Sequence, residues 1–251
     1  MNLPQYSDIG KAHRRIKGLI HRTPVFTSSG INSLTGGELY FKAENLQKVG
    51  AFKFRGACNA VFSLPEEDVK KGVITHSSGN HGAALALAAR LKGVTAHVIM
   101  PDNAPEIKKA AVAGYGAEIT FCKPTLEARE STLAGMVERT GATEIHPYNN
   151  FSVISGQGTA AKELIEDYGE FDLVMAPVGG GGLLGGTALA VKQLSPHCRV
   201  IAAEPEGADD ACRSFNSKTL IPSVNPQTIA DGLHTSLGER NFAIILEKVD
   251  D

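Results

Sequence analysis

Short apolar runs alternate with longer helix-forming segments along most of the chain. The runs have the length and composition of strands, and they cover residues 38–43, 73–76, 96–100, 118–122, 173–177 and 200–203. Helices are predicted between and around them: one capped by Ser7 and Asp8 and running through residue 20, one that contains Lys53, and others at residues 83–91, 105–113, 126–140, 158–168 and 183–194. This alternation predicts an α/β fold in which helices cover both faces of parallel sheets. Sheets of this kind bind ligands beyond the carboxyl ends of their strands.

Lys53 stands between two aromatic residues, Phe52 and Phe54, shortly after the first predicted strand. A lysine in such a place either extends its ammonium into solvent or is desolvated, and desolvation favours the neutral, nucleophilic amine. The first alternative is the commoner one, because most lysines are solvated. Lys53 becomes a candidate catalytic residue only in combination with other parts of the chain.

Two turns that follow predicted strands present backbone groups suited to binding an anion. They consist of Ser77, Ser78, Gly79, Asn80, His81 and Gly82, and of Gly179, Gly180, Gly181 and Gly182. A turn between a strand and a helix leaves free N–H groups, which bind a carboxylate or phosphate together with the helix dipole. Glycines also leave no side chain to block the approach. The structural alternatives are capping of a helix by Ser78 or Asn80 and, for the glycines, a flexible linker.

Composition excludes several classes of function. The 251 residues carry 25 Lys and Arg against 27 Asp and Glu, without a basic run, so nucleic acid is not an expected partner. The four cysteines form no CxxC pair, which argues against a zinc or redox motif and favours reduced thiols. With no apolar N-terminal segment and no stretch of membrane-spanning length, we expect a soluble, cytoplasmic protein without a membrane partner.

In this order and spacing, the Lys53 segment, the Ser-Ser-Gly-Asn-His-Gly turn and the tetraglycine loop resemble the fold type II pyridoxal-phosphate enzymes, specifically the serine racemase and serine/threonine dehydratase family. Further matches at residues 146–149, 155–159, 202–210 and 228–232 extend the resemblance over nearly the whole chain. Within the family, residues 76–81 and 202–210 look most like eukaryotic serine racemases. The resemblance implies two three-layer, parallel-sheet domains of the tryptophan synthase β-like architecture. Residues 72–149 would form a small domain, inserted into a large cofactor-binding domain of residues 1–71 and 150–251. A homodimer is expected.

The resemblance also implies the reaction. The chain would be a pyridoxal-phosphate-dependent serine racemase and an L-serine/L-threonine dehydratase, that is, an ammonia-lyase that gives a keto acid and ammonia. Lys53 would anchor pyridoxal 5'-phosphate and act as a base on one face of the substrate, and Ser78 would be the acid or base on the opposite face. Both outcomes pass through one α-carbanion, for which the cofactor is the electron sink. The sequence does not rank serine, threonine and 3-hydroxyaspartate as substrates.

The remaining roles that the resemblance implies concern binding. The substrate carboxylate would be held by Ser77, Ser78, Gly79, Asn80 and His81. The cofactor would contact Phe52, Lys53 and Asn80, and its phosphate would bind to Gly179, Gly180, Gly181 and Gly182. Glu204, Ala208 and Asp210 match a site for Mg²⁺ or Ca²⁺, where the alternative is a helix start with acidic residues. Ser28, Ser29 and Lys48 align with part of a nucleotide site, but Val49 and Ala51 replace hydroxyl residues in that stretch, so ATP regulation is not predicted.

The match to the family pattern ends at residues 244–251. Family members continue with a Ser-Gly-Gly-Asn segment whose serine bonds the pyridine nitrogen, so we expect one cofactor contact fewer and an incomplete large domain. An inactive paralogue that acts as a binding or dimerisation module is therefore one alternative. An NAD-dependent oxidoreductase is another, because Gly180, Gly182 and Gly185 satisfy GxGxxG and Glu204 follows nineteen residues later. That alternative leaves Lys53 and the first turn without a role.

Overall fold

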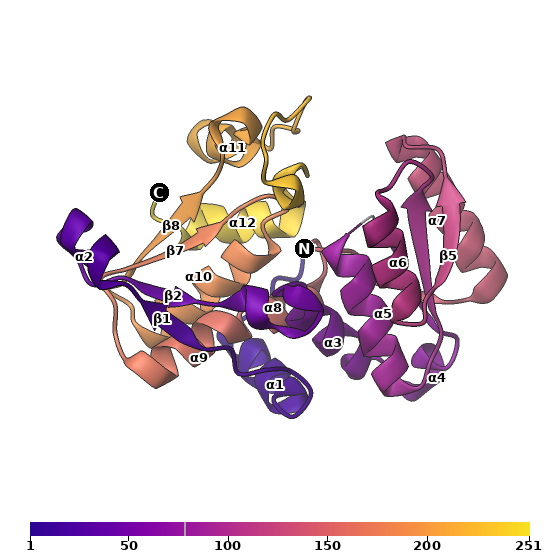
Figure 1. The fold of residues 1–251 in the computed structure, drawn as a ribbon, viewed down its shortest axis with the longest axis horizontal. Helices are drawn as coiled ribbons and strands as arrows, with labels where there is room; N and C mark the ends of the chain where they lie inside the picture. The colour runs from indigo at the N-terminus through magenta and orange to yellow at the C-terminus, as the bar shows by residue number, and fades with distance from the viewer. Residues whose placement is uncertain (78) are drawn as a thin grey trace.

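The structure is a computed structural model that describes residues 1–77 and 79–251. Figure 1 shows its elements in two lobes. The lobe on the right contains a parallel sheet of strand order β5-β4-β3-β6. Its strands are β3 (Val73–His76), β4 (Ala96–Pro101), β5 (Glu118–Cys122) and β6 (Thr143–Glu144). Its helices are α4 (Glu66–Val69), α5 (Asn80–Lys92), α6 (Glu106–Gly114) and α7 (Leu126–Thr140).

This sheet is covered on both faces, and its two central strands are therefore almost entirely buried. Because side chains alternate along a strand, Ile74 and Ile99 face one side, where they pack against Leu133 of α7. Val98 faces the other side, where it packs against Val112 of α6. The continuous apolar runs of the sequence are what a parallel sheet between two helical layers requires.

The second lobe combines two small sheets with most of the remaining helices. Its strands are β1 (Val25–Thr27) and β2 (Tyr40–Lys42), which pair antiparallel, and β7 (Leu173–Pro177) and β8 (Arg199–Ala203), which pair parallel. Its helices are α1 (Tyr6–Ile16), α2 (Ser29–Thr35), α8 (Phe151–Gln157), α9 (Thr159–Tyr168), α10 (Gly182–Leu194), α11 (Asp210–Ser217) and α12 (Glu239–Lys248). Short 3-10 turns lie at η1 (Glu44–Leu46), η2 (Lys48–Gly50), η3 (Glu206–Ala208) and η4 (Asp231–Leu233).

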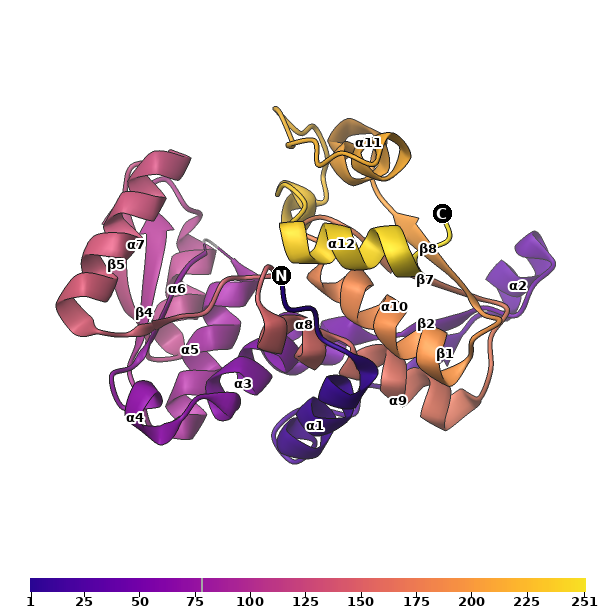
Figure 2. The ribbon, with the colours of Figure 1, turned by 180° about the vertical axis from the view of Figure 1, so that it is seen from behind.

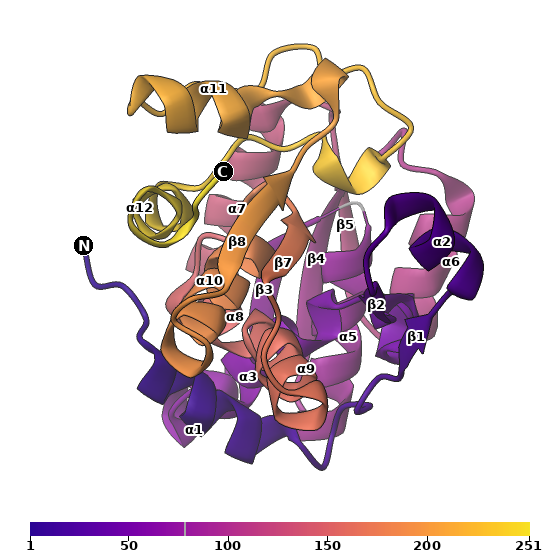
Figure 3. The ribbon, with the colours of Figure 1, turned by 90° about the vertical axis from the view of Figure 1, so that its left-hand side faces the viewer.

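Helix α10 is the centre of this lobe. Figure 2 shows α12 lying against it, and Figure 3 shows β7 and β8 on another side. The inward-facing residues of β7, Val174 and Ala176, belong to the same core as Leu184 of α10. The outward-facing residues of that strand, Leu173 and Met175, are 43% and 60% exposed. Strand β7 thus has one buried and one accessible face.

Helix α3 (Lys53–Ser63) lies between the lobes, packed against α5 and α8. Its residues Phe54, Ala57 and Val61 recur at helical spacing and share a core with α5. At the crossing with α8 the backbones are in contact, because a Cβ added at Gly156 would lie 2.6 Å from the carbonyl oxygen of Arg55. The start of α3, which carries Lys53, is held by this close packing.

A buried network of ion pairs also holds α3 in place, through Arg55. Arg55 is fully buried and donates hydrogen bonds of 2.7 to 2.9 Å to both Glu44 and Glu163. Lys42 of β2 bonds the same Glu163 at 2.9 Å. Two cations therefore face two carboxylates, so the network is balanced. Such pairs cost much stability when one partner is removed, because the other charge is left buried and unpaired.

Most predicted elements are confirmed, with shifted ends. The first helix has Gln5 as its N-cap rather than Ser7 and Asp8, and Gln5 forms a capping box with Asp8. The helix ends at Ile16 rather than at residue 20. Elements absent from the prediction are β1, α2, α4, β6, α8, α11, α12 and the 3-10 turns. No helix in the described ranges, 1–77 and 79–251, is long and apolar enough to cross a membrane. The boundaries at residues 72 and 149 stay a prediction.

Candidate functional site

The two anion-binding turns of the prediction follow the carboxyl ends of β3 and β7. The first turn leads from β3 into α5, whose N-cap position is Gly79. Gly79 has no side chain, and Asn80 is already a residue of the first helical turn, so capping by Asn80 does not occur. His81 is buried, 2% exposed. Ser78, the predicted second catalytic residue, lies outside the described residues.

The tetraglycine loop leads from β7 into α10. Gly179, Gly180, Gly181 and Gly182 are all buried, and Gly181 has a φ of 85°, which disfavours a side chain. The amide groups of Gly179, Gly180 and Gly181 have no hydrogen-bond acceptor among the residues that the structure describes. Buried amides without acceptors are costly, and these are in a position to donate to an anion at the helix start. The loop is no flexible linker, since it joins a strand to a helix directly and is packed on both sides.

Lys53 is the first residue of α3. The residue keeps part of its surface accessible, but its Nζ has only one hydrogen-bond partner among the described residues, the carbonyl oxygen of Pro147 at 3.2 Å. The rings of Phe52 and Tyr148 lie 5.3 and 5.9 Å from it. Burial lowers the pKa of Lys53 to about 8, because the ammonium loses hydration and finds no carboxylate nearby. The neutral, nucleophilic fraction of this amine near neutral pH is therefore much larger than that of an ordinary lysine.

Residues 145–149 connect these three parts of the chain. The carbonyl oxygen of Ile145 lies 3.2 Å from Nε2 of His81, and that of Pro147 accepts from Lys53. The ring of Tyr148 lies against the tetraglycine loop, where a Cβ added at Gly180 would be 2.3 Å from Cγ of the ring. The 145–149 segment thus contacts the first turn, the lysine and the glycine loop.

Two histidines, His81 beside this segment and His146 within it, are held neutral. Burial, with a smaller effect from Lys53, lowers the pKa of His81 to about 3. Burial and the neighbouring His76 lower the pKa of His146 to about 4. A neutral His146 accepts hydrogen bonds on Nδ1 from the amides of Tyr148 and Asn149, at 3.3 and 2.9 Å. These rings order the 145–149 segment without adding positive charge beside Lys53.

The predicted cation ligands lie around the start of α11. The carboxylate of Glu204 accepts hydrogen bonds from the amides of Ala211 and Cys212 at 3.1 and 2.9 Å. Asp210 is buried; its Oδ2 accepts from the amide of Leu237 at 3.0 Å, whereas Oδ1 has no partner among the described residues. Burial raises the pKa of both carboxyl groups. The Glu204 carboxylate faces α11, which does not fit the ribose contact that the NAD-dependent alternative required.

Sequence reasoning missed several residues that shape the site. Pro147 and Tyr148 belong to a stretch that matched the family, but nothing in their spacing indicated contact with Lys53. Asn241 of α12 donates from Nδ2 to the carbonyl oxygens of Tyr148 and Gly180, at 3.1 and 2.6 Å. Its position in a short C-terminal helix carried no signal at all. Only the folded structure brings it to the glycine loop.

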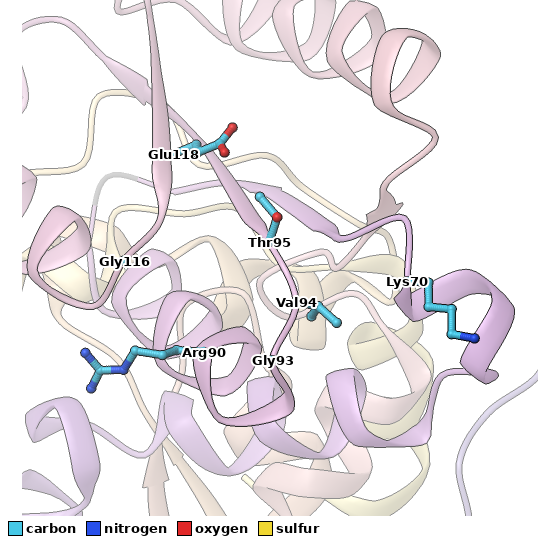
Figure 4. Close-up of a pocket in the computed structure, with 7 residues that line it drawn as sticks. All are labelled: Lys70, Arg90, Gly93, Val94, Thr95, Gly116 and Glu118. Carbon is cyan, nitrogen blue, oxygen red and sulfur yellow. The ribbon is translucent and has the colours of Figure 1, made fainter.

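Two surface hollows lie outside the contact between Lys53 and the glycine loop. One, of about 480 Å³, lies where β4 and β5 begin, and Figure 4 shows its lining residues Lys70, Arg90, Gly93, Val94, Thr95, Gly116 and Glu118. This is the amino end of the sheet, opposite the end from which the first turn emerges. The other, of about 590 Å³, lies beside α7 and is bordered by His76 and His146. Neither is lined by Lys53 or by the glycine loop.

Comparisons with known proteins agree with the geometry. The profile of the pyridoxal-phosphate dependent enzyme family matches residues 16–251. The chain is 54% identical over 245 residues to the serine racemase of Dictyostelium discoideum, and the match covers 97% of this chain and 76% of that protein. It is 49% identical over 252 residues to the L-threo-3-hydroxyaspartate ammonia-lyase of Saccharomyces cerevisiae, with 100% and 77% covered. The crystal structure of a threonine deaminase from T.th. matches with a TM-score of 0.93 at 46% identity, over 98% of this chain and 80% of that one, which confirms the predicted fold class. The chain therefore belongs to the pyridoxal-phosphate dependent enzyme family.

Proposed function

We propose that this chain is a serine racemase and an L-serine/L-threonine dehydratase, with Lys53 as the residue that binds pyridoxal phosphate covalently. The desolvated amine of Lys53 carries the proposal: its pKa is lowered to about 8, and its Nζ lies near the rings of Phe52 and Tyr148, the second of which contacts the glycine loop. The relatives support the reaction class, because they include a serine racemase, an ammonia-lyase and a threonine deaminase.

The residues present fit the cofactor. A reactive amine, Lys53, meets the need for a covalent anchor, and Phe52 and Tyr148 offer apolar faces to a ring. The acceptor-free amides of the tetraglycine loop suit a phosphate at the start of α10. When bound, pyridoxal phosphate supplies an electron sink for charge at the substrate α-carbon. Asn80 is the proposed partner of the cofactor ring hydroxyl, on the basis of the family resemblance.

The protein's own part in the reaction is to bind the substrate and move its α-proton. The turn of residues 77–81 would hold the substrate carboxylate with its backbone amides, since it precedes the helix α5. Once the substrate amine has displaced it from the cofactor, Lys53 would take the α-proton on one face, since its lowered pKa favours the neutral amine that can act as a base. Ser78 would return a proton on the other face, which inverts the centre. Loss of the β-hydroxyl as water, instead of reprotonation, would give a 2-aminoacrylate, and its hydrolysis by water would give the keto acid and ammonia.

We also propose a Mg²⁺ or Ca²⁺ site at Glu204, the carbonyl of Ala208 and Asp210. A buried carboxylate oxygen of Asp210 without a partner among the described residues supports it, as does the all-oxygen donor set. Added Mg²⁺ or Ca²⁺ should raise the melting temperature of the wild type, and Glu204→Gln should abolish that rise. Glu206→Gln, an exposed neighbour, is the control. A wild type that does not respond to either ion would contradict the site.

The same proposal includes a homodimer, a cytoplasmic location and the division of the chain at residues 72 and 149, all of which rest on the family resemblance. ATP regulation is not part of it, since Val49 and Ala51 replace hydroxyl residues. Light scattering of the purified protein would test the homodimer. A monomer at micromolar concentration would exclude it.

The central experiment combines labelling with turnover. The purified protein loaded with pyridoxal phosphate should show a visible absorption band that borohydride bleaches, and peptide mapping should find the reduced adduct on Lys53. Incubation with L-serine should yield D-serine and pyruvate, and both should vanish in Lys53→Ala but persist in the surface variant Lys218→Ala. Ser78→Ala should suppress D-serine more than pyruvate. An adduct elsewhere, or bound NAD without a reducible adduct, would overturn the assignment, and cofactor binding without turnover would indicate a binding or dimerisation module.

A further inference from the structure

The tetraglycine loop is held between two neighbours. On one side, the ring of Tyr148 leaves no room for a Cβ at Gly180. On the other, a Cβ added at Gly181 would lie 2.6 Å from Leu237 and 2.8 Å from Cβ of Asn241, at the start of α12. Figure 2 shows α12 against α10, the helix that the loop begins. The loop backbone is therefore in direct contact with a segment more than fifty residues later in the chain.

Asn241 joins the two sides of this clamp. Its side chain is fully buried, and its Nδ2 donates to Gly180 O at 2.6 Å and to Tyr148 O at 3.1 Å. Because both neighbours are carbonyl oxygens, the amide nitrogen and not the amide oxygen must face them. The one side chain thus ties the glycine loop to the 145–149 segment, which itself contacts Lys53 through Pro147.

The Gly180 carbonyl does not need Asn241 as a hydrogen-bond donor. Gly180 O already accepts from the amide of Gly238 at 3.2 Å. Asn241 Oδ1, in contrast, is buried without a partner among the described residues, which is an unfavourable arrangement. Because burial of this oxygen is unfavourable, we infer that the side chain of Asn241 has a role there, which is to fix the direction of the Gly180 carbonyl.

That direction sets the direction of an amide. In a trans peptide unit the carbonyl oxygen and the following N–H point in opposite directions. Drawing Gly180 O toward Asn241 therefore turns the N–H of Gly181 away from α12. This N–H has no acceptor among the described residues and stands just before the first turn of α10.

We propose that Asn241 is a positioning residue for cofactor phosphate: by holding Gly180 O it aims the Gly181 amide at the phosphate. The inference rests on the proposed phosphate role of the glycine loop. It predicts that Asn241 contributes to the affinity for pyridoxal phosphate and not to the affinity for pyridoxal, which has the same ring and aldehyde but no phosphate.

The test is a titration of the apo form of the full chain with each of these two compounds. Binding is measured from the growth of the visible absorption band. Asn241→Asp places a carboxylate oxygen against two carbonyl oxygens, so the Gly180 peptide should turn. The ratio of the pyridoxal Kd to the pyridoxal phosphate Kd should fall about tenfold from its wild-type value, with the pyridoxal Kd within about twofold of wild type. Asn241→Ala, which removes the donors without adding charge, should shift the ratio in the same direction.

A surface variant, Asn216→Asp on α11, is the matched control and should keep the wild-type ratio. Equal weakening of both compounds, or an unchanged ratio in Asn241→Ala, would overturn the inference while leaving the cofactor assignment intact. If the wild type itself does not prefer pyridoxal phosphate to pyridoxal, the phosphate role of the glycine loop fails instead. Should Asn241→Asp not fold, the Asn241→Ala ratio alone decides.

Discussion

Substitution of Gly180 by alanine tests the contact between the glycine loop and the 145–149 segment. The added Cβ would lie 2.3, 2.4 and 2.5 Å from three ring carbons of Tyr148. Carbon atoms in contact are separated by about 3.5 to 4.0 Å, so the ring or the loop must retreat by about 1 Å or more. Both sides are tied by the bonds of Asn241 to Tyr148 O and Gly180 O. Neither can move without disturbing the other.

The expected cost follows from overpacking in a dense interior. Such substitutions cost about 1 to 3 kcal/mol, and the overlap here is at the severe end. If the strain is released by moving the loop or the ring, it appears in cofactor affinity, where about 1.4 to 3 kcal/mol corresponds to a Kd raised about 10- to 150-fold. Strain that is not released should appear instead as a lower melting temperature of the apo protein.

Two measurements on the same preparations separate these outcomes: titration of the apo protein with pyridoxal phosphate, and thermal unfolding of the apo protein. Gly135→Ala in α7 is the matched control, because nothing lies within 4 Å of its added Cβ. It should leave affinity unchanged and stabilise the helix by up to about 1 kcal/mol. Removing the ring as well, in Gly180→Ala with Tyr148→Ala, should recover part of the loss. Wild-type affinity together with a wild-type melting temperature in Gly180→Ala would refute the described contact.

Three further predictions concern charge. Competitive labelling of the apo protein with an amine reagent should give Lys53 a midpoint near pH 8, against about 10.4 for an ordinary lysine; a midpoint near 10 would contradict its desolvation. The pKa of His81 is about 3 in the folded protein and about 6.5 in the unfolded chain. Between these pH values the imidazole binds a proton only in the unfolded chain. The free energy of unfolding therefore falls as the pH falls from 6.5 to 3, by up to about 1.4 kcal/mol per pH unit. His81→Gln should therefore show a shallower loss of unfolding free energy on acidification, and an unchanged slope would refute the assignment. Arg55→Met should lower the free energy of chemical unfolding by about 3 to 5 kcal/mol, because it removes one of the two cations that bond the buried carboxylate of Glu163. Arg22→Met, which removes an exposed ion pair, should lower it by less than about 1 kcal/mol. Equal losses in the two variants would contradict the burial argument.

Most strands of the two parallel sheets and the glycine loop could be predicted because their determinants are local. Strands β3, β5 and β7 have the predicted ends, since short apolar runs between turns are recognisable in the sequence alone. The helices α8, α11 and α12 were missed, although α8 has a side-chain cap from Asn150. Helices α8 and α11 are only 7 and 8 residues long, and what stabilises such helices is burial against the rest of the fold rather than their own propensity.

The candidate site was predictable in its parts and not in its assembly. The sequence indicated Lys53 and the two turns as separate features, and only the resemblance joined them. The residues that bring them together, Pro147, Tyr148 and Asn241, act through carbonyl oxygens, a ring face and a buried amide. Contacts of this kind depend on where the backbone runs, so they leave no pattern of residue types in the chain.

A comparison of two lysines shows why the structure distinguishes a reactive amine from a structural one. Lys42 has a side chain that is only 8% exposed, yet its Nζ bonds the carboxylate of Glu163 at 2.9 Å, so its positive charge is matched by a nearby negative one. Lys53 has two ring faces and a carbonyl oxygen around its Nζ, and among the described residues it has no carboxylate partner. It also occupies the first turn of α3, where the positive end of the helix dipole disfavours an ammonium further. Burial alone therefore does not make a lysine nucleophilic. A lysine becomes nucleophilic when it is buried without a counterion and lies at the start of a helix. Lys53 meets these two conditions, and Lys42 meets neither.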